Sequence, residues 1–263
     1  MLFQDDTGHQ IQLKDHPTRI ISLCPSITET LFDLGLANNI IGRTSFCIHP
    51  SDNVSMVKSI GGPKKINREL IHSLEPDLII ASKEENIKED ILYLRKKLSV
   101  CTFDVKSIED AIKMIRSLGF LTGKTHTASG YISKIEDHMT SLKNNHLNVK
   151  ALYLIWKNPW MGAGKDTFIS DMLKCAGIKN CLSDNASGYP IIQDDANIEM
   201  DYILLSSEPY PFSDQHMEEV INRFGSRKIL LVDGEMFSWY GTRMVKAFPY
   251  IKSVAEKIKA GQE

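Results

Sequence analysis

The chain has 263 residues, of which 42% are hydrophobic and 24% are charged. It is therefore too apolar for a disordered protein and long enough to bury a core without disulfides or metals. Its 31 Lys and Arg residues nearly balance 33 Asp and Glu residues, so no basic surface for nucleic acid is expected. No segment approaches the roughly 20 apolar residues of a membrane-spanning helix, which excludes membrane insertion.

The start of the chain shows no basic n-region followed by an apolar stretch, as a secretory leader would. Two alternatives stay open: a cytosolic chain, or one whose leader has been removed. None of the cysteines forms a C-x-x-C pair, and their odd number and wide spacing favour reduced, mostly buried thiols. They are Cys24, Cys47, Cys101, Cys175 and Cys181.

The first part of the chain alternates short apolar runs with helical patterns. Strands are predicted at residues 19–24, 40–44, 78–81 and 100–103. Helical spacing follows the first strand, where Ser26 is a candidate N-cap with Glu29 three residues on, and recurs at 69–74 and 107–118. This alternation predicts parallel βαβ units.

The periodicity then changes. An apolar stripe at three- and four-residue spacing predicts one long amphipathic helix from about Thr125 to Asn145. Strands at 151–156, 202–205 and 228–232 follow, the last two expected to be buried, with helices at 166–177 and 244–258. The expected fold is α/β, with an N-terminal lobe at 1–121, a connecting helix at 122–147 and a C-terminal lobe at 148–263.

Catalytic and metal-binding signatures are missing. Residues 162–166 resemble a phosphate loop but place Asp166 where Ser or Thr must meet magnesium. Cys47 and His49 form at most a pair of metal ligands, and a loop histidine beside a buried thiol is the simpler interpretation. Without a nucleophile–base pair we predict no enzyme, no catalytic residue and no metal site.

Aromatic residues instead collect just after the predicted strands, where open parallel sheets bind ligands. Core packing explains Trp156 equally well. The run 237–241 holds too many large rings for a solvent-exposed loop, which favours a binding surface there. Residues 210–212 follow a strand end in the same way. The remaining aromatics at strand ends are Phe46, Trp160, Trp239 and Tyr240.

Five segments, in this order, resemble the substrate-binding proteins of ABC transporters for cobalamin, haem and iron-siderophores, the class III periplasmic binding proteins. They are the run from Arg19 through Cys24-Pro25-Ser26-Ile27-Thr28-Glu29 to Leu36, Ile60-Gly61-Gly62 with Ile66 to Ile71, Leu74-Glu75-Pro76-Asp77 with Leu78 to Ile80, Gly164 to Ile169 with Ala176 to Asn180, and Tyr240-Gly241-Thr242-Arg243. The resemblance covers nearly the whole chain.

This resemblance implies two Rossmann-like lobes with parallel sheets joined by a single long helix. It also implies non-enzymatic capture of cobalamin, haem or a ferric siderophore in the cleft between them, with no intrinsic cofactor. The expected partner is an ABC permease, and a monomer in the periplasm is expected. Siderophore-type members often use clustered arginines. Only Arg43 and Arg243 are candidates here, so cobalamin or haem is preferred.

Site residues follow from the strand ends and the resemblance together. Trp239 departs from cobalamin-type members, which carry a basic residue there, and Glu235 matches their acidic one. For permease docking, Glu69 matches the first-lobe glutamate, while Gln193 replaces the second and leaves Asp194 as the nearest acid. The expected ligand-binding residues are Phe46, Trp156, Trp160, Tyr189, Glu235, Trp239, Tyr240 and Arg243.

Two other functions stay open. The first is a cytosolic metal- or tetrapyrrole-handling protein on the same fold, acting as a chaperone, sensor or chelatase-like enzyme. The absent leader and the Cys47/His49 pair favour it, and the absent acid–base constellation disfavours its enzymatic form. The second is a pair of lobes whose cleft is closed by its own aromatics and binds nothing.

Overall fold

The computed structural model describes residues 1–142, 147–182, 186–193 and 198–261. The chain forms two compact units. Unit 1 comprises Met1–Val105, Glu109–Ser133 and Tyr240–Arg243, and unit 2 comprises Lys106–Ile108, Lys134–Trp239 and Met244–Glu263. The predicted α/β class with parallel sheets is confirmed. The lobe boundaries expected from the sequence stay a prediction.

Unit 1 is built on a parallel four-stranded sheet in the order β4-β3-β7-β8. Its strands are β3 (Ile20–Ser22), β4 (Ile40–Arg43), β7 (Leu78–Ser82) and β8 (Val100–Phe103). All four were predicted, because a parallel sheet covered on both faces produces short continuous apolar runs. Every residue of β3, β7 and β8 is buried.

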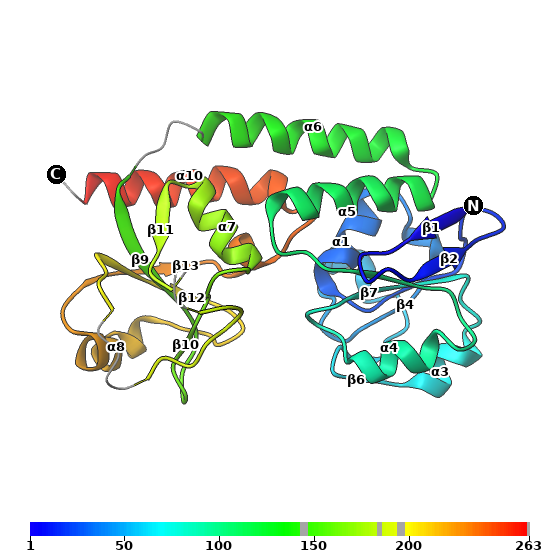
Figure 1. Cartoon of the computed structure of the whole chain (residues 1–263), viewed down its shortest axis with the longest axis horizontal. Coiled ribbons are helices and arrows are strands. Elements are labelled where there is room, and N and C mark those ends of the chain that lie inside the picture. The colour runs from blue at the N-terminus through cyan, green and yellow to red at the C-terminus, as the bar shows by residue number, and fades with distance from the viewer. Residues whose placement is uncertain (143–146, 183–185, 194–197, 262–263) are drawn as a thin grey trace. The chain divides into compact units, whose positions relative to one another are not determined.

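Helices cover both faces of this sheet (Figure 1). One face carries α1 (Pro25–Asp33) and α5 (Ile108–Leu121), and the other carries α3 (Arg68–Ser73) and α4 (Lys88–Leu94). On the second face the core joins strand residues to Ile71 and Leu94 of the helices, all fully buried. Each such side chain contributes about 1.5–3 kcal/mol to folding.

The predicted capping box at the start of α1 is wrong. The helix begins at Pro25, and its N-cap residue is Cys24, which makes no side-chain capping hydrogen bond. Proline is favoured at the first helical position because its φ is already helical and its missing N–H would be unpaired there. Ser26 therefore lies inside the first turn, and Glu29 pairs with Arg243 instead.

The sequence did not reveal the shortest elements of unit 1, since two or three residues are too few to show a periodicity. These elements are the hairpin β1 (Leu2–Gln4) and β2 (Gln10–Gln12), the hairpin β5 (Gly61–Gly62) and β6 (Lys65–Ile66), η1 (Ala37–Asn39) and α2 (Ser51–Val54). The seven-residue helix α4 was also missed.

In the described part of unit 2 a five-stranded sheet has the order β10-β9-β12-β13, with β11 also pairing with β9. Only the β9–β10 pair is antiparallel among these. The predicted burial of β13 is wrong, because it is an edge strand and Leu231 is 39% exposed. The strands are β9 (Val149–Trp156), β10 (Met161–Gly162), β11 (Ile178–Asn180), β12 (Tyr202–Ser206) and β13 (Lys228–Val232).

Alternation along β12 separates the two faces of this sheet. Leu205 packs with Val220 of α8 (Met217–Phe224). On the other face the Tyr202 hydroxyl donates to the carbonyl of Ile258 in α10 (Met244–Ala260) at 3.1 Å. The remaining helices of the unit are α7 (Phe168–Cys175), α9 (Glu235–Ser238) and the 3-10 turn η2 (Asp214–His216), drawn with the others in Figure 1.

The long predicted helix is α6 (Thr125–Leu142), whose residues through Ser133 count with unit 1 and whose later residues count with unit 2. Its expected end at Asn145 lies outside the described residues. That it alone joins two lobes stays a prediction. None of the helices in the described ranges combines the length and the apolarity needed to cross a membrane.

Candidate functional site

An aromatic cluster lies at the carboxyl ends of β9 and β12 in unit 2. The Trp156 ring, at the end of β9, meets Tyr210 edge-on with a centroid distance of 5.6 Å. Trp160 stacks on Phe212 at 6.1 Å and packs edge-on against Phe224 of α8 at 5.4 Å. We call this set the aromatic cluster: Trp156, Trp160, Tyr210, Phe212, His216 and Phe224.

Hydrogen bonds fix the segment that carries Tyr210. Its backbone N–H donates to the carbonyl of Ile155 at 3.2 Å, which holds residues 207–212 along the end of β9. Its hydroxyl lies 3.1 Å from Nε2 of His216, whose Nδ1 accepts from the Ser213 N–H. Trp156 is 39% exposed, whereas Phe212 is buried. The cluster therefore presents one ordered aromatic ring to solvent on a fixed base.

The sequence favoured a binding surface at the run 237–241, but its three aromatic rings are buried. Phe237 is fully buried and Trp239 is 8% exposed. Trp239 Nε1 donates to Oε1 of Glu208 at 2.9 Å, and the Ser238 hydroxyl donates to the same oxygen at 2.7 Å. Burial and the negative charges of Glu235 and Asp233 raise the pKa of Glu208 above its usual range. The large rings are accounted for by packing, and Trp239 orients a carboxylate.

Tyr240 and Arg243 belong to unit 1 and are both 5% exposed. Arg243 Nε donates to Oε2 of Glu29 at 2.7 Å. The Tyr240 hydroxyl lies 3.3 Å from Sγ of Cys24, which donates to Oε1 of Glu85 at 3.0 Å. Burial raises the pKa of both Tyr240 and Cys24. These side chains make polar contacts inside unit 1, where Cys24 and Glu85 follow the carboxyl ends of β3 and β7.

Phe46 follows β4 in unit 1 and is 63% exposed. A Cβ added to Gly62 would lie 3.5 Å from the Phe46 ring, an ordinary van der Waals distance, so the ring lies close to the β5–β6 hairpin. Arg43, just before it, donates to the carbonyls of Val54 and Thr44. Its guanidinium is thus engaged by the backbone, while Phe46 stays available to a ligand.

The remaining predicted residues lie at the surface or partly buried. Tyr189 and Glu235 are half-buried in unit 2. Glu69 is exposed in the first turn of α3. Gln193 is exposed, and its carbonyl accepts from Nη2 of Arg223 at 2.5 Å. Asp194 lies outside the described residues.

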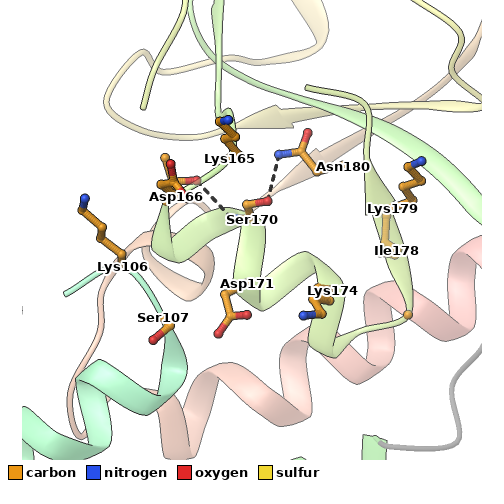
Figure 2. A pocket seen from close by; sticks show the side chains of 12 residues that line it. Lys106, Ser107, Lys165, Asp166, Ser170, Asp171, Lys174, Ile178, Lys179 and Asn180 are labelled. Carbon is orange, nitrogen blue, oxygen red and sulfur yellow. Dashed lines mark hydrogen bonds between the residues drawn. The ribbon is translucent and has the colours of Figure 1, made fainter. Parts of the chain in front are cut away.

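A pocket of about 540 Å³ lies beside α7 in unit 2, and none of the predicted ligand-binding residues lines it (Figure 2). Lys106, Lys165 and Lys179 point in different directions around it. Thr167 accepts from the Ser170 N–H, and Asn180 donates to the Ser170 hydroxyl, so polar groups of its wall are used to hold the helix. These polar groups of the pocket wall therefore stabilise the fold.

The phosphate-loop-like segment forms one side of this pocket. The N–H groups of Gly164 and Lys165 donate to the carbonyls of Gly188 and Ala186, each at 2.7 Å. A phosphate would need such N–H groups free. They are committed to the backbone, which agrees with the mismatch to the nucleotide loop in the sequence.

Within the described residues, Cys47 and His49 do not belong to a metal site. The described parts of the chain hold no group of three or more His, Cys, Asp or Glu side chains that could bind a metal ion. The Cys47 sulfur accepts from the Thr28 hydroxyl at 3.0 Å and lies 3.1 Å from that of Thr44. All five cysteines are free. Hydroxyl contacts and burial thus explain Cys47 without a metal.

Sequence reasoning missed Glu208, His216 and Phe224 as neighbours of the aromatic residues. The sequence did carry a signal for Glu208, because a charged residue follows two positions after β12, whose first four residues are hydrophobic. Sequence spacing alone could not bring His216 and Phe224 to the cluster, since they come from η2 and α8.

Comparison with known proteins identifies the family of this chain. The periplasmic binding protein family matches residues 20–223. YvrC of Bacillus subtilis, an uncharacterized ABC transporter substrate-binding lipoprotein, is 24% identical over 270 residues, covering 97% of this chain and 84% of that protein. The cobalamin-binding protein of Halobacterium salinarum is 23% identical over 208 residues. That match covers 75% of this chain but only about half, 55%, of the relative.

Solved structures share the fold. The periplasmic vitamin B12 binding protein BtuF of Vibrio cholerae superposes with a TM-score of 0.79 at 17% identity, covering 93% of this chain and 98% of that one. The periplasmic haem-binding protein RhuT from Roseiflexus gives 0.75 at 19% identity, with 93% and 99% covered. The family match spans both units. It contains every residue of the aromatic cluster except Phe224. The chain therefore belongs to the periplasmic binding protein family.

Proposed function

We propose that this protein captures a flat metal chelate of the corrin or tetrapyrrole kind and passes it to an ABC permease outside the cytoplasm. Family membership supports the transport role, as does a relative named as an ABC substrate-binding lipoprotein. Relatives and structural neighbours named for cobalamin, vitamin B12 and haem support the ligand class. The protein binds and releases its ligand unchanged.

The observation that carries the ligand class is the aromatic cluster. Ligands of parallel α/β sheets bind at the carboxyl ends of the strands, and Trp156 offers an exposed ring at that edge. A ring contact with a macrocycle contributes about 0.5–1.5 kcal/mol beyond the area that it buries. In unit 1, Phe46 offers a second exposed ring after β4. The cleft expected between two lobes stays a prediction.

The arginines argue against a polyanionic chelate. Arg43 is engaged by backbone carbonyls and Arg243 by Glu29. Clustered guanidinium groups are the usual recognition elements for anionic groups. With these two engaged internally, a flat chelate held by aromatic contacts is the better fit.

The cytosolic metal-handling alternative is not proposed. It depended on Cys47 and His49 as metal ligands and on the start of the chain. Cys47 is buried against the hydroxyls of Thr28 and Thr44, and the family points to transport. We assign permease docking to Glu69, an exposed carboxylate in the first turn of α3.

Equilibrium dialysis of the purified chain against cyanocobalamin, haemin and ferrioxamine B, read by ligand absorbance, tests the proposal. One of the first two should bind at one site per chain, and Trp156→Ala should weaken its binding about three- to tenfold. Phe120→Ala is the matched control, since Phe120 is 49% exposed on α5 and should leave binding unchanged. An equal loss in both variants, or no loss in either, would contradict the role given to the cluster.

A further inference from the structure

Glu208 occupies the same edge of the unit 2 sheet as the aromatic cluster. It lies two residues after the end of β12 and two residues before Tyr210. The segment is held against β9 by the bond from Tyr210 N–H to Ile155, and Tyr210 itself contacts Trp156. Glu208 thus lies on the same fixed segment as Tyr210, whose ring packs against the Trp156 ring that we propose contacts the ligand.

The structure holds Glu208 in one orientation. Its Oε1 atom accepts from the hydroxyl of Ser238 and from Nε1 of Trp239. Its backbone carbonyl accepts from the Ser206 hydroxyl at 2.5 Å, and Ser206 in turn accepts from Tyr153 at 3.1 Å. The side chains of Ser238 and Trp239 therefore hold the carboxylate of Glu208. The hydroxyls of Tyr153 and Ser206 hold its backbone carbonyl.

Gly234 provides the space for this side chain. A Cβ at that position would lie 2.5 Å from Cγ of Glu208 and 2.4 Å from the Ser206 hydroxyl oxygen. Both distances are below any real Cβ contact, so a larger residue at position 234 would displace the stem of Glu208. Gly234, Trp239 and Ser238 together hold the carboxylate of Glu208 in a fixed position.

The second carboxylate oxygen has no partner of this kind. Within the described residues Oε2 of Glu208 accepts no hydrogen bond, and no ion pair joins Glu208 to a cation. Lys157, whose Nζ lies 5.8 Å from the centroid of the Tyr210 ring, pairs with Glu219. An oriented carboxylate with one unused oxygen is a hydrogen-bond acceptor that is ready for a donor from outside the chain.

We propose that Glu208 accepts an N–H donor from the bound ligand and thereby selects chelates whose periphery carries neutral amides over those that carry carboxylates. This inference rests on the proposed function and names its ligand class more narrowly. A ligand carboxylate facing Glu208 would meet a like charge in a partly dehydrated site. A corrin with amide side chains would satisfy the unused oxygen, whereas the carboxylates of haemin would be repelled.

A matched pair of ligands isolates this effect. Dicyanocobinamide and dicyanocobyrinic acid share the corrin ring and the cyanide ligands, but their side chains are amides in the first and carboxylates in the second. The wild-type chain should bind the amide form at least tenfold more tightly. Glu208→Gln keeps the shape and an oxygen for Ser238 and Trp239 and removes the charge. Glu208→Gln should reduce the ratio of the two affinities, amide form over acid form, at least fivefold. Most of this change should come from tighter binding of the acid form.

Glu256→Gln is the control, because Glu256 is an exposed carboxylate on α10 and should leave the ratio unchanged. An unchanged ratio in Glu208→Gln, or a wild-type preference for the acid form or for haemin, would overturn the role of Glu208 while leaving chelate capture intact. No binding of any corrin, haemin or ferrioxamine would instead refute the proposed function. The two failures are therefore distinguishable.

Discussion

Arg243 lies in a motif that resembles a family turn, yet its guanidinium is part of an internal ion pair. Both Arg243 and Glu29 have side chains that are only 5% exposed, and their atoms are 2.7 Å apart. A buried charge left without its partner costs far more than the pair itself contributes. The structure thus gives Arg243 a stabilising role within unit 1.

Arg243→Met should therefore lower the free energy of unfolding by about 3–5 kcal/mol, because it strands the Glu29 carboxylate in the core. Urea unfolding followed by circular dichroism measures this. Arg116→Met, on the exposed face of α5, should change the free energy of unfolding by less than about 0.5 kcal/mol. A stable Arg243→Met variant with weakened chelate binding would instead assign the residue to the ligand.

Glu208 should make the protein less stable as pH rises. Its pKa is raised in the folded state, first by burial and then by Glu235 and Asp233, so the folded protein holds the proton of Glu208 more tightly than the unfolded chain does. That contribution to stability is complete below the ordinary glutamate pKa and disappears as pH rises through the raised one.

Glu208→Gln removes this dependence, so it should unfold at higher urea than the wild type at pH 8, and the difference should shrink toward pH 4. A variant that gains stability and loses ligand selectivity identifies a residue that serves binding. Equal midpoints at both pH values would show that the carboxylate is not strained in the fold.

The sequence located strand-end aromatics because parallel sheets place their ligands there, but it could not determine their burial. Trp156 is exposed and Trp239 is buried, although both follow predicted strands. The difference arises from contacts that are distant in sequence: Trp239 bonds to Glu208, 31 residues away. Which of the expected residues touch a ligand stays a prediction.

Among the secondary-structure elements, α7 shows how capping follows from sequence. Thr167 is the N-cap: its hydroxyl accepts from the Ser170 N–H at 3.2 Å and donates to the carbonyl of Gly164 at 2.8 Å. The side chain is almost fully buried, so its loss leaves both groups without a partner.

Thr167→Ala should cost about 1–2 kcal/mol of stability, whereas Thr167→Ser keeps the hydroxyl and should cost much less. Thermal unfolding of the two variants checks this. Equal melting temperatures for Ala and Ser at this position would mean that the cap contributes nothing and that the threonine methyl group dominates.

Strands with long apolar runs, such as β7 and β9, were predictable because both faces are buried. The edge strand β13 misled, since its run Ile229-Leu230-Leu231 is as apolar as that of a central strand but is covered on one side only. Tertiary position, which periodicity does not contain, decided its exposure. The capping box at Ser26 failed for a local reason, because the helix begins at Pro25, two residues earlier than an N-cap at Ser26 would allow.

At the scale of the whole molecule, we propose a chelate-binding edge in unit 2 and a docking carboxylate in unit 1. Glu69→Lys should reduce uptake of the ligand about tenfold in cells that carry the cognate permease, because it reverses the charge at the proposed docking position. Chelate affinity in vitro should be unchanged. Glu89→Lys, at a matching first-turn position on α4, should leave uptake normal. A parallel loss of affinity and uptake in Glu69→Lys would count against docking.

The most direct test of chelate capture is isothermal titration of the purified wild-type chain with cyanocobalamin, with haemin and ferrioxamine B as separate comparisons. We expect saturable binding of cyanocobalamin at one site per chain, tighter than that of haemin. Absence of saturable heat with all three ligands would contradict the claim that this protein captures a metal chelate.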